Sequence, residues 1–190
     1  MYYPDKTIYV GGWANDLPSG QGHLFYPSGE YYKGGFIAGM RQGSGEYFYI
    51  NGDIYQGQWM SDKKNGMGKM AHANGDIFEG QYGQDGIEGG GGTYSYFYGN
   101  KFSGQHMKGK RTGLGEVKYY NNSILRCNFN KGNAEGNGEM TYSNGDRYEG
   151  QFNNSQKEGI GIYTFSTGGK YEGSFRGDER NGVGTMVNSS

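Results

Sequence analysis

The sequence is poor both in residues that build reactive sites and in net charge. Its 190 residues include one cysteine, Cys127, and three histidines, and its formal net charge is −1. A single cysteine permits no intramolecular disulfide, which fits a reducing compartment. The near-zero net charge provides no general electrostatic attraction to nucleic acid or to a membrane surface. We therefore expect neither a disulfide-stabilised fold nor a nucleic-acid-binding protein.

Long apolar segments and aliphatic residues are scarce as well. No apolar run approaches the length of a membrane span, and the first residues show no signal-peptide pattern, so we expect a soluble, cytoplasmic protein. Val, Ile and Leu are too few for a compact sandwich or α/β core, whereas 40 residues are glycine and 16% are aromatic. Disordered chains are depleted in aromatic residues. A thin core, repeated along an extended array, is the organisation that this composition favours.

A repeated phrase provides the register of that array. Residues 51–59 read NGDIYQGQW, residues 74–82 read NGDIFEGQY and residues 144–152 read NGDRYEGQF. Taking the first aromatic position of the phrase as the start of a unit gives eight starts, seven of them aromatic. They are Tyr9, Tyr32, Tyr55, Phe78, Phe102, Leu125, Tyr148 and Tyr171. The steps are 23 residues except for one of 24 in the fourth unit, where the loop 83–89 holds the extra residue.

Each unit carries further residues at fixed distances from its start. A glycine follows two residues after the start, an aromatic ring four residues after it, and then a Gly-x-Gly. We expect the Gly-x-Gly to begin a second strand. The departures fall in units five and six, which we expect to be locally distorted. They are His106 at a ring position, Leu125 at a start, Cys127 at a glycine position and Asn122 at a turn glycine.

The combination of Tyr-x-Gly-x-Trp, Gly-x-Gly and a 23-residue period resembles the MORN repeat, and the resemblance covers essentially the whole chain. We divide the chain into eight repeats and an N-terminal half-repeat that caps the first edge. We interpret the half-repeat as the second strand of an incomplete preceding unit, with Pro4-Asp5-Lys6 as its turn. The half-repeat is 1–8, and the repeats are 9–31, 32–54, 55–77, 78–101, 102–124, 125–147, 148–170 and 171–190. The resemblance implies a non-enzymatic module. Proteins of this family serve as assembly and docking parts in radial spokes, other axonemal complexes and cytoskeletal rings, and several self-associate through terminal repeats.

Alternation within each unit predicts strands with one buried and one polar face. The start, the glycine and the second ring share one face, because successive side chains of a strand point to opposite faces. The predicted fold is all-β: an extended, twisted, single-layer antiparallel β-meander with one hairpin per repeat and no helix. Asn51-Gly52 could form a two-residue turn, with Tyr49 and Tyr55 on opposite faces. We favour a three-residue loop with Gly52 in the left-handed conformation, which places both rings on one face.

Candidate catalytic and metal-binding residues have simpler structural explanations. His72 and His106 fall on ring positions, so we expect them to replace a ring in a stack, and no His or Cys spacing suggests a metal site. Cys127 is expected to be a small, partly buried residue. The acidic residues after the turns recur at one position and are interpreted as turn residues on a solvated edge: Glu30, Asp53, Asp76 and Asp146. We predict no catalytic residue, no metal and no cofactor.

Two surfaces remain as candidate binding sites. The first is the aromatic face, whose ring stripe is suited to a helix or an extended segment of a protein partner. The residues predicted for this groove are Tyr9, Trp13, Tyr26, Tyr32, Phe36, Tyr49, Tyr55, Trp59, Tyr96 and Tyr119. The second is a basic cluster in units five and six that could meet an acidic protein or an anionic lipid. It consists of Lys101, Lys108, Lys110, Arg111, Lys118, Arg126 and Lys131.

The leading hypothesis is a protein-binding scaffold of a ciliary axoneme or another cytoskeletal assembly, acting through its aromatic groove and its repeat ends. Two alternatives stay open. One is a peripheral membrane module that uses the basic cluster, although a ribbon built to lie flat on a membrane should be basic along its whole length. The other is a regulatory partner of an enzyme on a separate chain.

Overall fold

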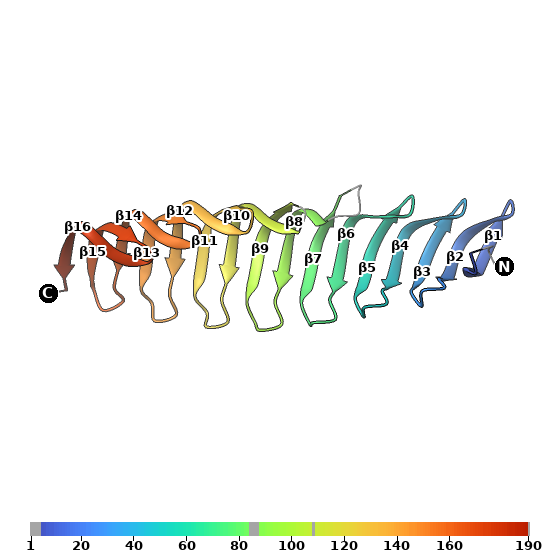
Figure 1. The fold of residues 1–190 in the computed structure, drawn as a ribbon, viewed down its shortest axis with the longest axis horizontal. Coiled ribbons are helices and arrows are strands. Elements are labelled where there is room, and N and C mark those ends of the chain that lie inside the picture. The colour runs from blue at the N-terminus through green and yellow to red at the C-terminus, as the bar shows by residue number, and fades with distance from the viewer. Residues whose placement is uncertain (1–4, 84–87, 108, 190) are drawn as a thin grey trace. The chain divides into compact units, whose positions relative to one another are not determined.

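The computed structural model describes residues 5–83, 88–107 and 109–189, and these form two compact units, 1–97 and 98–190. Strands and turns make up the described residues, which contain no helix and hence none that could cross a membrane. Each unit is an antiparallel meander in which strand order follows sequence order, as Figure 1 shows. The predicted all-β meander of hairpins is therefore confirmed within each unit.

The strands come in pairs, a shorter odd-numbered strand followed by a longer even-numbered one. In the first unit the strands are β1 (Ile8–Ala14), β2 (Leu17–Phe25), β3 (Tyr31–Ile37), β4 (Met40–Phe48), β5 (Ile54–Met60), β6 (Lys63–Ala71), β7 (Ile77–Tyr82) and β8 (Glu88–Ser95). In the second unit they are β9 (Lys101–Met107), β10 (Lys110–Lys118), β11 (Ile124–Asn130), β12 (Asn133–Thr141), β13 (Arg147–Asn153), β14 (Gln156–Thr164), β15 (Gly169–Arg176) and β16 (Glu179–Asn188).

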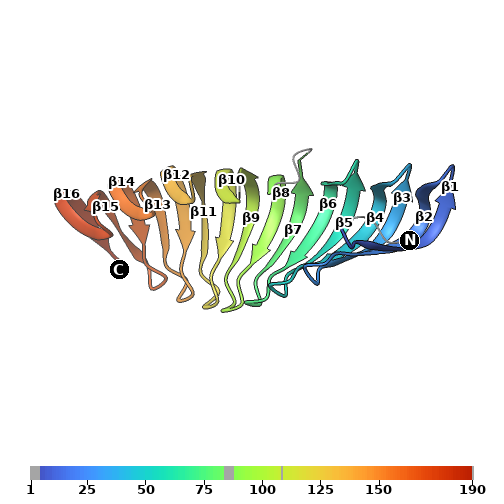
Figure 2. The same ribbon diagram turned by 45° about the vertical axis from the view of Figure 1, so that its right-hand side comes forward.

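Two kinds of turn alternate at opposite edges of each meander (Figure 2). Where the structure describes the whole connection, two-residue turns join an odd strand to the next even strand, and residues such as Ser61 and Asp62 have φ of 48° and 66° there. The other turns are three-residue loops. In the loop after β4, the Gly52 amide donates to the Tyr49 carbonyl at 3.0 Å, the Tyr49 amide donates to the Asp53 carbonyl at 3.0 Å, and Gly52 has φ of 88°. This is the three-residue loop favoured from the sequence.

The departures in units five and six do not disturb these turns. Asn122 has φ of 67° and its amide donates to the Tyr119 carbonyl at 2.9 Å, as the glycine does in the other loops. Asparagine tolerates this conformation better than most non-glycine residues. Near the N-terminus, Lys6 has φ of 67° at the position equivalent to Asn122, in the turn predicted for the N-terminal half-repeat. The strand predicted before that turn lies outside the described residues.

The Gly-x-Gly motifs lie inside the even strands and do not begin them, which corrects the prediction. Gly43 and Gly45, for example, lie within β4, which starts at Met40. The first glycine of each motif has positive φ, 74° at Gly43, and the β3–β4 register shifts between Gly34 and Phe36. The motif therefore makes a bulge, at which Gln42, Gly43 and Ser44 of the even strand face the single residue Gly35 and the even strand bends.

The core of each unit lies on one face of its sheet, which we call the aromatic face. The start rings are buried, with Tyr32 and Tyr55 at 0% exposure. Each start ring lies over a pair of glycines: a Cβ built on Gly45 would lie 2.2 Å from the Tyr32 hydroxyl oxygen. That hydroxyl donates to the Gly35 carbonyl at 3.1 Å. The glycines are needed because the ring occupies the space of their missing side chains.

Candidate functional site

The rings of the aromatic face form a continuous ladder within the first unit. Tyr32 makes edge-to-face contacts with Phe36 of its own repeat at 5.3 Å and with Trp59 of the next repeat at 5.1 Å between ring centroids. Tyr55 repeats this arrangement with Trp59 at 5.4 Å and Tyr82 at 4.9 Å. Edge-to-face pairs contribute about 0.5–1.5 kcal/mol each beyond the area that they bury. The ladder thus links neighbouring repeats and also forms the floor of the face.

A second column of rings stands above this floor on the even strands and their loops. Tyr26 and Tyr49 are half-buried, and their rings contact Tyr47 at 5.8 Å and 4.5 Å. Burial raises the pKa of Tyr26 and of Tyr49, so both hydroxyls stay protonated and can donate hydrogen bonds at neutral pH. These side chains present both ring surface and a polar tip to solvent.

A column of cations crosses the same face, nine residues after five of the eight starts. Arg41 lies 4.4 Å from the Trp59 ring centroid, and Lys64 lies 5.1 Å from that of Tyr82. The column consists of Arg41, Lys64, Arg111, Lys157 and Arg180, each within 6.0 Å of at least two ring centroids. Of these, only Arg111 was singled out from the sequence. The recurrence of a cation at this position was the signal that could have identified the column.

The rings and cations enclose a cleft that recurs from repeat to repeat. One cleft of about 280 Å³ is lined by Arg41, Tyr47, Tyr49, Trp59, Asp62, Lys63 and Lys64. A second, of about 360 Å³ in the other unit, is lined by the equivalent residues Lys157, Tyr163, Phe165, Phe175, Asp178, Glu179 and Arg180. A third, of about 420 Å³, includes Pro18, Leu24, Tyr26, Phe36, Gly39 and Arg41, one repeat before the first. Equivalent clefts thus occur on the aromatic face of both units.

In two of these clefts a carboxylate from the next hairpin turn meets the cation position. Asp62 Oδ1 accepts hydrogen bonds from the Arg41 Nε at 3.0 Å and from the Arg41 amide at 2.9 Å. Asp178 Oδ1 accepts the Lys157 amide at 2.9 Å in the equivalent place. These contacts hold the tight turn of one repeat against the strand of the repeat before it.

At the opposite edge another series of side chains fastens consecutive loops. Asp146 Oδ1 accepts the Ser166 amide at 2.8 Å, and its Oδ2 accepts the Tyr163 hydroxyl at 2.7 Å. The Ser166 amide and the Tyr163 hydroxyl hold the pKa of Asp146 below its usual value. Asp76 and Asp146 are both only 8% exposed. They are turn residues as predicted, but the interpretation of their edge as solvated was wrong for these two positions.

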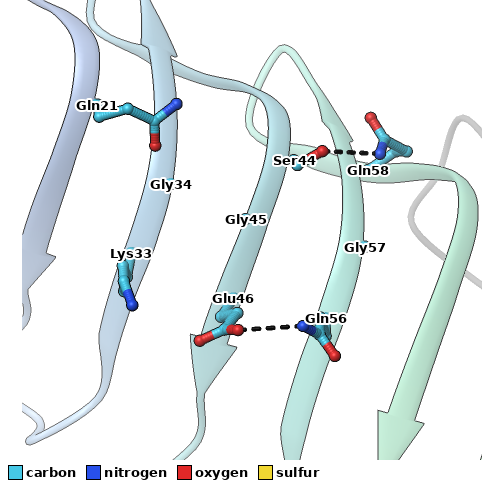
Figure 3. Close-up of a pocket in the computed structure, with 9 residues that line it drawn as sticks. All are labelled: Gln21, Lys33, Gly34, Ser44, Gly45, Glu46, Gln56, Gly57 and Gln58. Atoms are coloured by element: carbon cyan, nitrogen blue, oxygen red, sulfur yellow. Dashed lines mark hydrogen bonds between the residues drawn. The ribbon is translucent and has the colours of Figure 1, made fainter.

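The polar face on the other side of the sheet carries an open trough. Its floor is the backbone of Gly34, Gly45 and Gly57, and its volume is about 360 Å³ (Figure 3). The side chains along it bond one another, from Gln56 to Glu46 at 3.1 Å and from Gln58 to Ser44 at 2.9 Å. Since these polar groups already satisfy each other, we place the candidate site on the aromatic face.

The structure locates all ten predicted groove residues on the aromatic face, at different depths. Five are buried in the ladder: Tyr9, Tyr32, Phe36, Tyr55 and Trp59. Trp13 is 41% exposed. The remaining four are half-buried, and with Trp13 they are the ones that a partner could touch: Tyr26, Tyr49, Tyr96 and Tyr119.

The predicted basic residues do not form one patch. Lys101 and Lys118 lie directly opposite each other on the polar face, and Arg126 on that face pairs with Glu116 at 2.8 Å. Arg111 lies on the aromatic face, 5.5 Å from the Phe102 ring centroid. Lys110 and Lys131 are exposed at the tight-turn edge, and Lys108 lies outside the described residues.

The histidines and the cysteine take structural places. His106 makes an edge-to-face contact with Phe102 at 5.0 Å, and burial lowers its pKa. His72 is 6.1 Å from the Tyr94 ring, so both replace rings as predicted. Cys127 is 4% exposed, and burial raises the pKa of its thiol. Among the residues that the structure describes, no three His, Cys, Asp or Glu side chains gather into a possible metal site.

Successive hairpins on a 23-residue period, with a ring over a glycine pair in most repeats, define a β-hairpin repeat protein. The family model described as "MORN repeat" matches residues 9–31, 32–54, 55–77, 128–147, 148–170 and 171–190. The chain therefore belongs to the MORN-repeat family. No curated protein matches it.

Solved structures with a similar fold include domains of CPAP. The G-box domain of the microcephaly protein CPAP has a TM-score of 0.62 at 10% identity, over 100% of this chain and 97% of that one. The TCP10 domain of Danio rerio CPAP has a TM-score of 0.56 at 11% identity, over 92% and 82%. The TCP domain of Drosophila melanogaster SAS-4, in complex with a proline-rich motif of Ana2, has a TM-score of 0.48 at 17% identity, over 77% and 85%. At these identities the likeness concerns the fold.

Proposed function

We propose that this chain is a non-enzymatic scaffold that binds protein segments along its aromatic face. The observation that carries the proposal is the recurrence of one cleft, with half-buried rings beside a cation, at equivalent positions of different repeats. Rings with polar tips are favoured in binding surfaces, and two neighbouring equivalent clefts, as in the first unit, suit a helix or an extended segment. Membership of the MORN-repeat family supports the same function.

The cellular setting that we propose is a ciliary axoneme or another cytoskeletal assembly. This rests on the family, whose members occur as assembly parts of such structures. Self-association through the terminal repeats belongs to the same proposal. Any enzymatic activity in such an assembly would belong to separate chains. The described clefts combine aromatic rings with cations and carboxylates, and no nucleophile lies beside a base in them.

The test is affinity capture from a ciliated or cytoskeleton-rich extract with three versions of the chain. The first is the wild type, and the second is Tyr26→Ala/Tyr49→Ala, which removes two half-buried rings of the face. The third is Tyr31→Ala/Phe48→Ala, which removes two rings stacked at 4.1 Å on the opposite face and serves as the matched control. Each variant is first checked to be folded by circular dichroism.

Cytoskeletal proteins lost only from the Tyr26→Ala/Tyr49→Ala variant would support the proposed face. If that variant keeps every partner, the binding surface lies at the repeat ends or the turns. If no protein is captured and anionic vesicles are retained in its place, the membrane alternative replaces the scaffold.

A further inference from the structure

The surroundings of Arg111 on the aromatic face differ from those of Arg41 and Lys157 by the loss of one carboxylate. Arg41 meets Asp62, and the Lys157 amide meets Asp178, from the tight turn of the following repeat. The residue in that place beside Arg111 is Gly132, whose amide donates to the Arg111 carbonyl at 3.0 Å. The turn is thus in the same position, but it supplies no acceptor side chain.

The guanidinium of Arg111 is therefore presented on the aromatic face without an internal counter-ion. It lies 5.5 Å and 5.3 Å from the ring centroids of Phe102 and Phe129 and is half-buried. Within the described part of the chain Arg111 forms no ion pair of 4.0 Å or less. Its neighbours Lys110 and Lys131 are exposed cations. A guanidinium that is partly withdrawn from water gains from a charged acceptor.

We propose that Arg111 binds a carboxylate side chain of an extended partner segment, at the place that Asp62 fills beside Arg41. The protein itself provides the template, with Asp62 Oδ1 at 3.0 Å from the Arg41 Nε. The inference rests on the proposed function, because the partner segment is the one that lies along the aromatic face. It adds that this segment carries an Asp or Glu where it crosses β10.

A carboxylate on a peptide fits this site better than a lipid headgroup does. The guanidinium lies over the ring faces of Phe102 and Phe129 and is only half-buried, so a side chain on a flexible segment can reach it. A bilayer surface would instead meet the exposed cations, and these are divided between the polar face and the turn edge. Asp62, which fills the corresponding place beside Arg41, is likewise a carboxylate with a single negative charge.

Two substitutions at Gly132 provide a matched pair for the test. Gly132→Asp supplies the missing internal carboxylate, and Gly132→Asn supplies a side chain of the same shape without charge. Gly132 has φ of 101° and open space around it, and Asp62 and Asp178 occupy equivalent places with φ of 66° and 71°. Both substitutions therefore require the backbone at 132 to shift towards the φ of Asp62 and Asp178, a strain that the charged and the uncharged variant share, and thermal unfolding checks that each variant is folded. Lys118→Gln removes a charge from the polar face as a second control.

The experiment follows the Arg111 side-chain Nε–Hε signal by NMR in the full chain, with Arg111→Gln used for assignment. The probes are a blocked pentapeptide with a central Asp, the same peptide with Asn, inorganic phosphate, and phosphatidylserine vesicles. We expect the Asp peptide to bind at least about tenfold more tightly than the Asn peptide, as a charge-assisted hydrogen bond implies. Gly132→Asp should shift the signal without peptide and abolish the response, whereas Gly132→Asn and Lys118→Gln should keep it.

Several results would overturn the inference. These are equal binding of the two peptides, a Gly132→Asp variant that responds like the wild type, or an equal loss in Lys118→Gln. Phosphate that matches the Asp peptide, or vesicles that bind through Arg111 while both peptides are inert, would also reject a carboxylate site. The protein-binding function is tested separately through Tyr26 and Tyr49 of the other unit, so either can fail without the other.

Discussion

The Cys127 side chain occupies the space that a tyrosine hydroxyl fills in other repeats, because Leu125, two residues earlier, is too short to reach it. A Cβ on Gly138 would lie 2.8 Å from the Cys127 Sγ, just as a Cβ on Gly68 would lie 2.5 Å from the Tyr55 hydroxyl oxygen. Both Leu125 and Cys127 are 4% exposed. The two departures from the repeat pattern therefore compensate for each other and leave the core filled.

This compensation predicts that the same exchange is tolerated elsewhere only when both residues change. A Cβ on Gly34 would lie 2.4 Å from the Tyr32 hydroxyl oxygen, so Gly34→Cys alone should cost about 2 to 3 kcal/mol through overpacking. Combining it with Tyr32→Leu should give a favourable coupling of at least about 1 kcal/mol. Urea unfolding of the wild type, both single variants and the double variant measures the coupling. Strictly additive losses would contradict the compensation.

Cys127 should react slowly with thiol reagents in the folded protein. Its burial and raised pKa leave little accessible thiolate at neutral pH. We expect the rate of reaction with a disulfide reagent to be on the order of a hundredfold lower in buffer than in denaturant, since local opening must come first. A fast, stoichiometric reaction of the native chain would show that the thiol is exposed.

The Asp146 carboxylate should stabilise the loop edge through its bonds to the next repeat. Asp146→Ala removes acceptors for the Ser166 amide and the Tyr163 hydroxyl, and we expect a loss of about 2 to 3 kcal/mol. Tyr163→Phe should cost less, and the double variant should lose less than the sum because the two share one bond. Thermal and urea unfolding measure both effects. The exposed Glu172→Ala provides a control with little expected change.

Stability should fall at alkaline pH because the start rings are buried tyrosines. Burial raises the pKa of Tyr32 and of Tyr148 to about 12, whereas tyrosine in an unfolded chain titrates near ~10. This contribution to stability is complete below pH ~10 and is lost as pH rises towards about 12, because the unfolded state releases its protons first. Melting temperatures and tyrosinate absorbance between these limits test this.

Tyr32→Phe serves as the matched control for the alkaline transition, since Phe78 and Phe102 hold the same position in their own repeats. This variant removes one titrating group, so its melting temperature should fall less steeply with rising pH than that of the wild type. A wild-type melting temperature that stays constant over this range would contradict the shifted pKa values.

The period and the turn chemistry made most of the fold predictable. Tyr55 and Tyr49 were assigned to one face because a glycine in the left-handed conformation fits a three-residue loop, and the structure has that loop. The tight turn at the opposite edge has no constant marker: Gly39, Gly132 and Gly177 lie in some of these turns, but others lack glycine. Residues such as Ser61 and Asp62 adopt positive φ there without glycine, so the sequence pattern does not indicate where that turn falls.

The burial of each ring and the ring contacts of the cations could not be predicted from alternation alone. The bulge at the Gly-x-Gly changes the pairing by two residues, so Arg41 lies opposite Phe36, a pairing that counting on from Gly34 and Gly45 does not give. Burial of Asp76 and Asp146 likewise depends on contacts with loops about 20 residues away. The sequence predicted which rings lie on the aromatic face, whereas the packing decides which of them are accessible.

The fastening of each loop to the next has a mechanical consequence. When a unit is pulled by its ends, a terminal repeat can detach only after its carboxylate contacts and its ladder contacts have broken, while the remaining repeats keep theirs. Extension should therefore proceed by peeling in steps of one 23-residue repeat, each releasing roughly 80 Å of chain. The repeats with the fewest such contacts would unfold at the lowest force, so a unit under tension would lengthen in steps of increasing force.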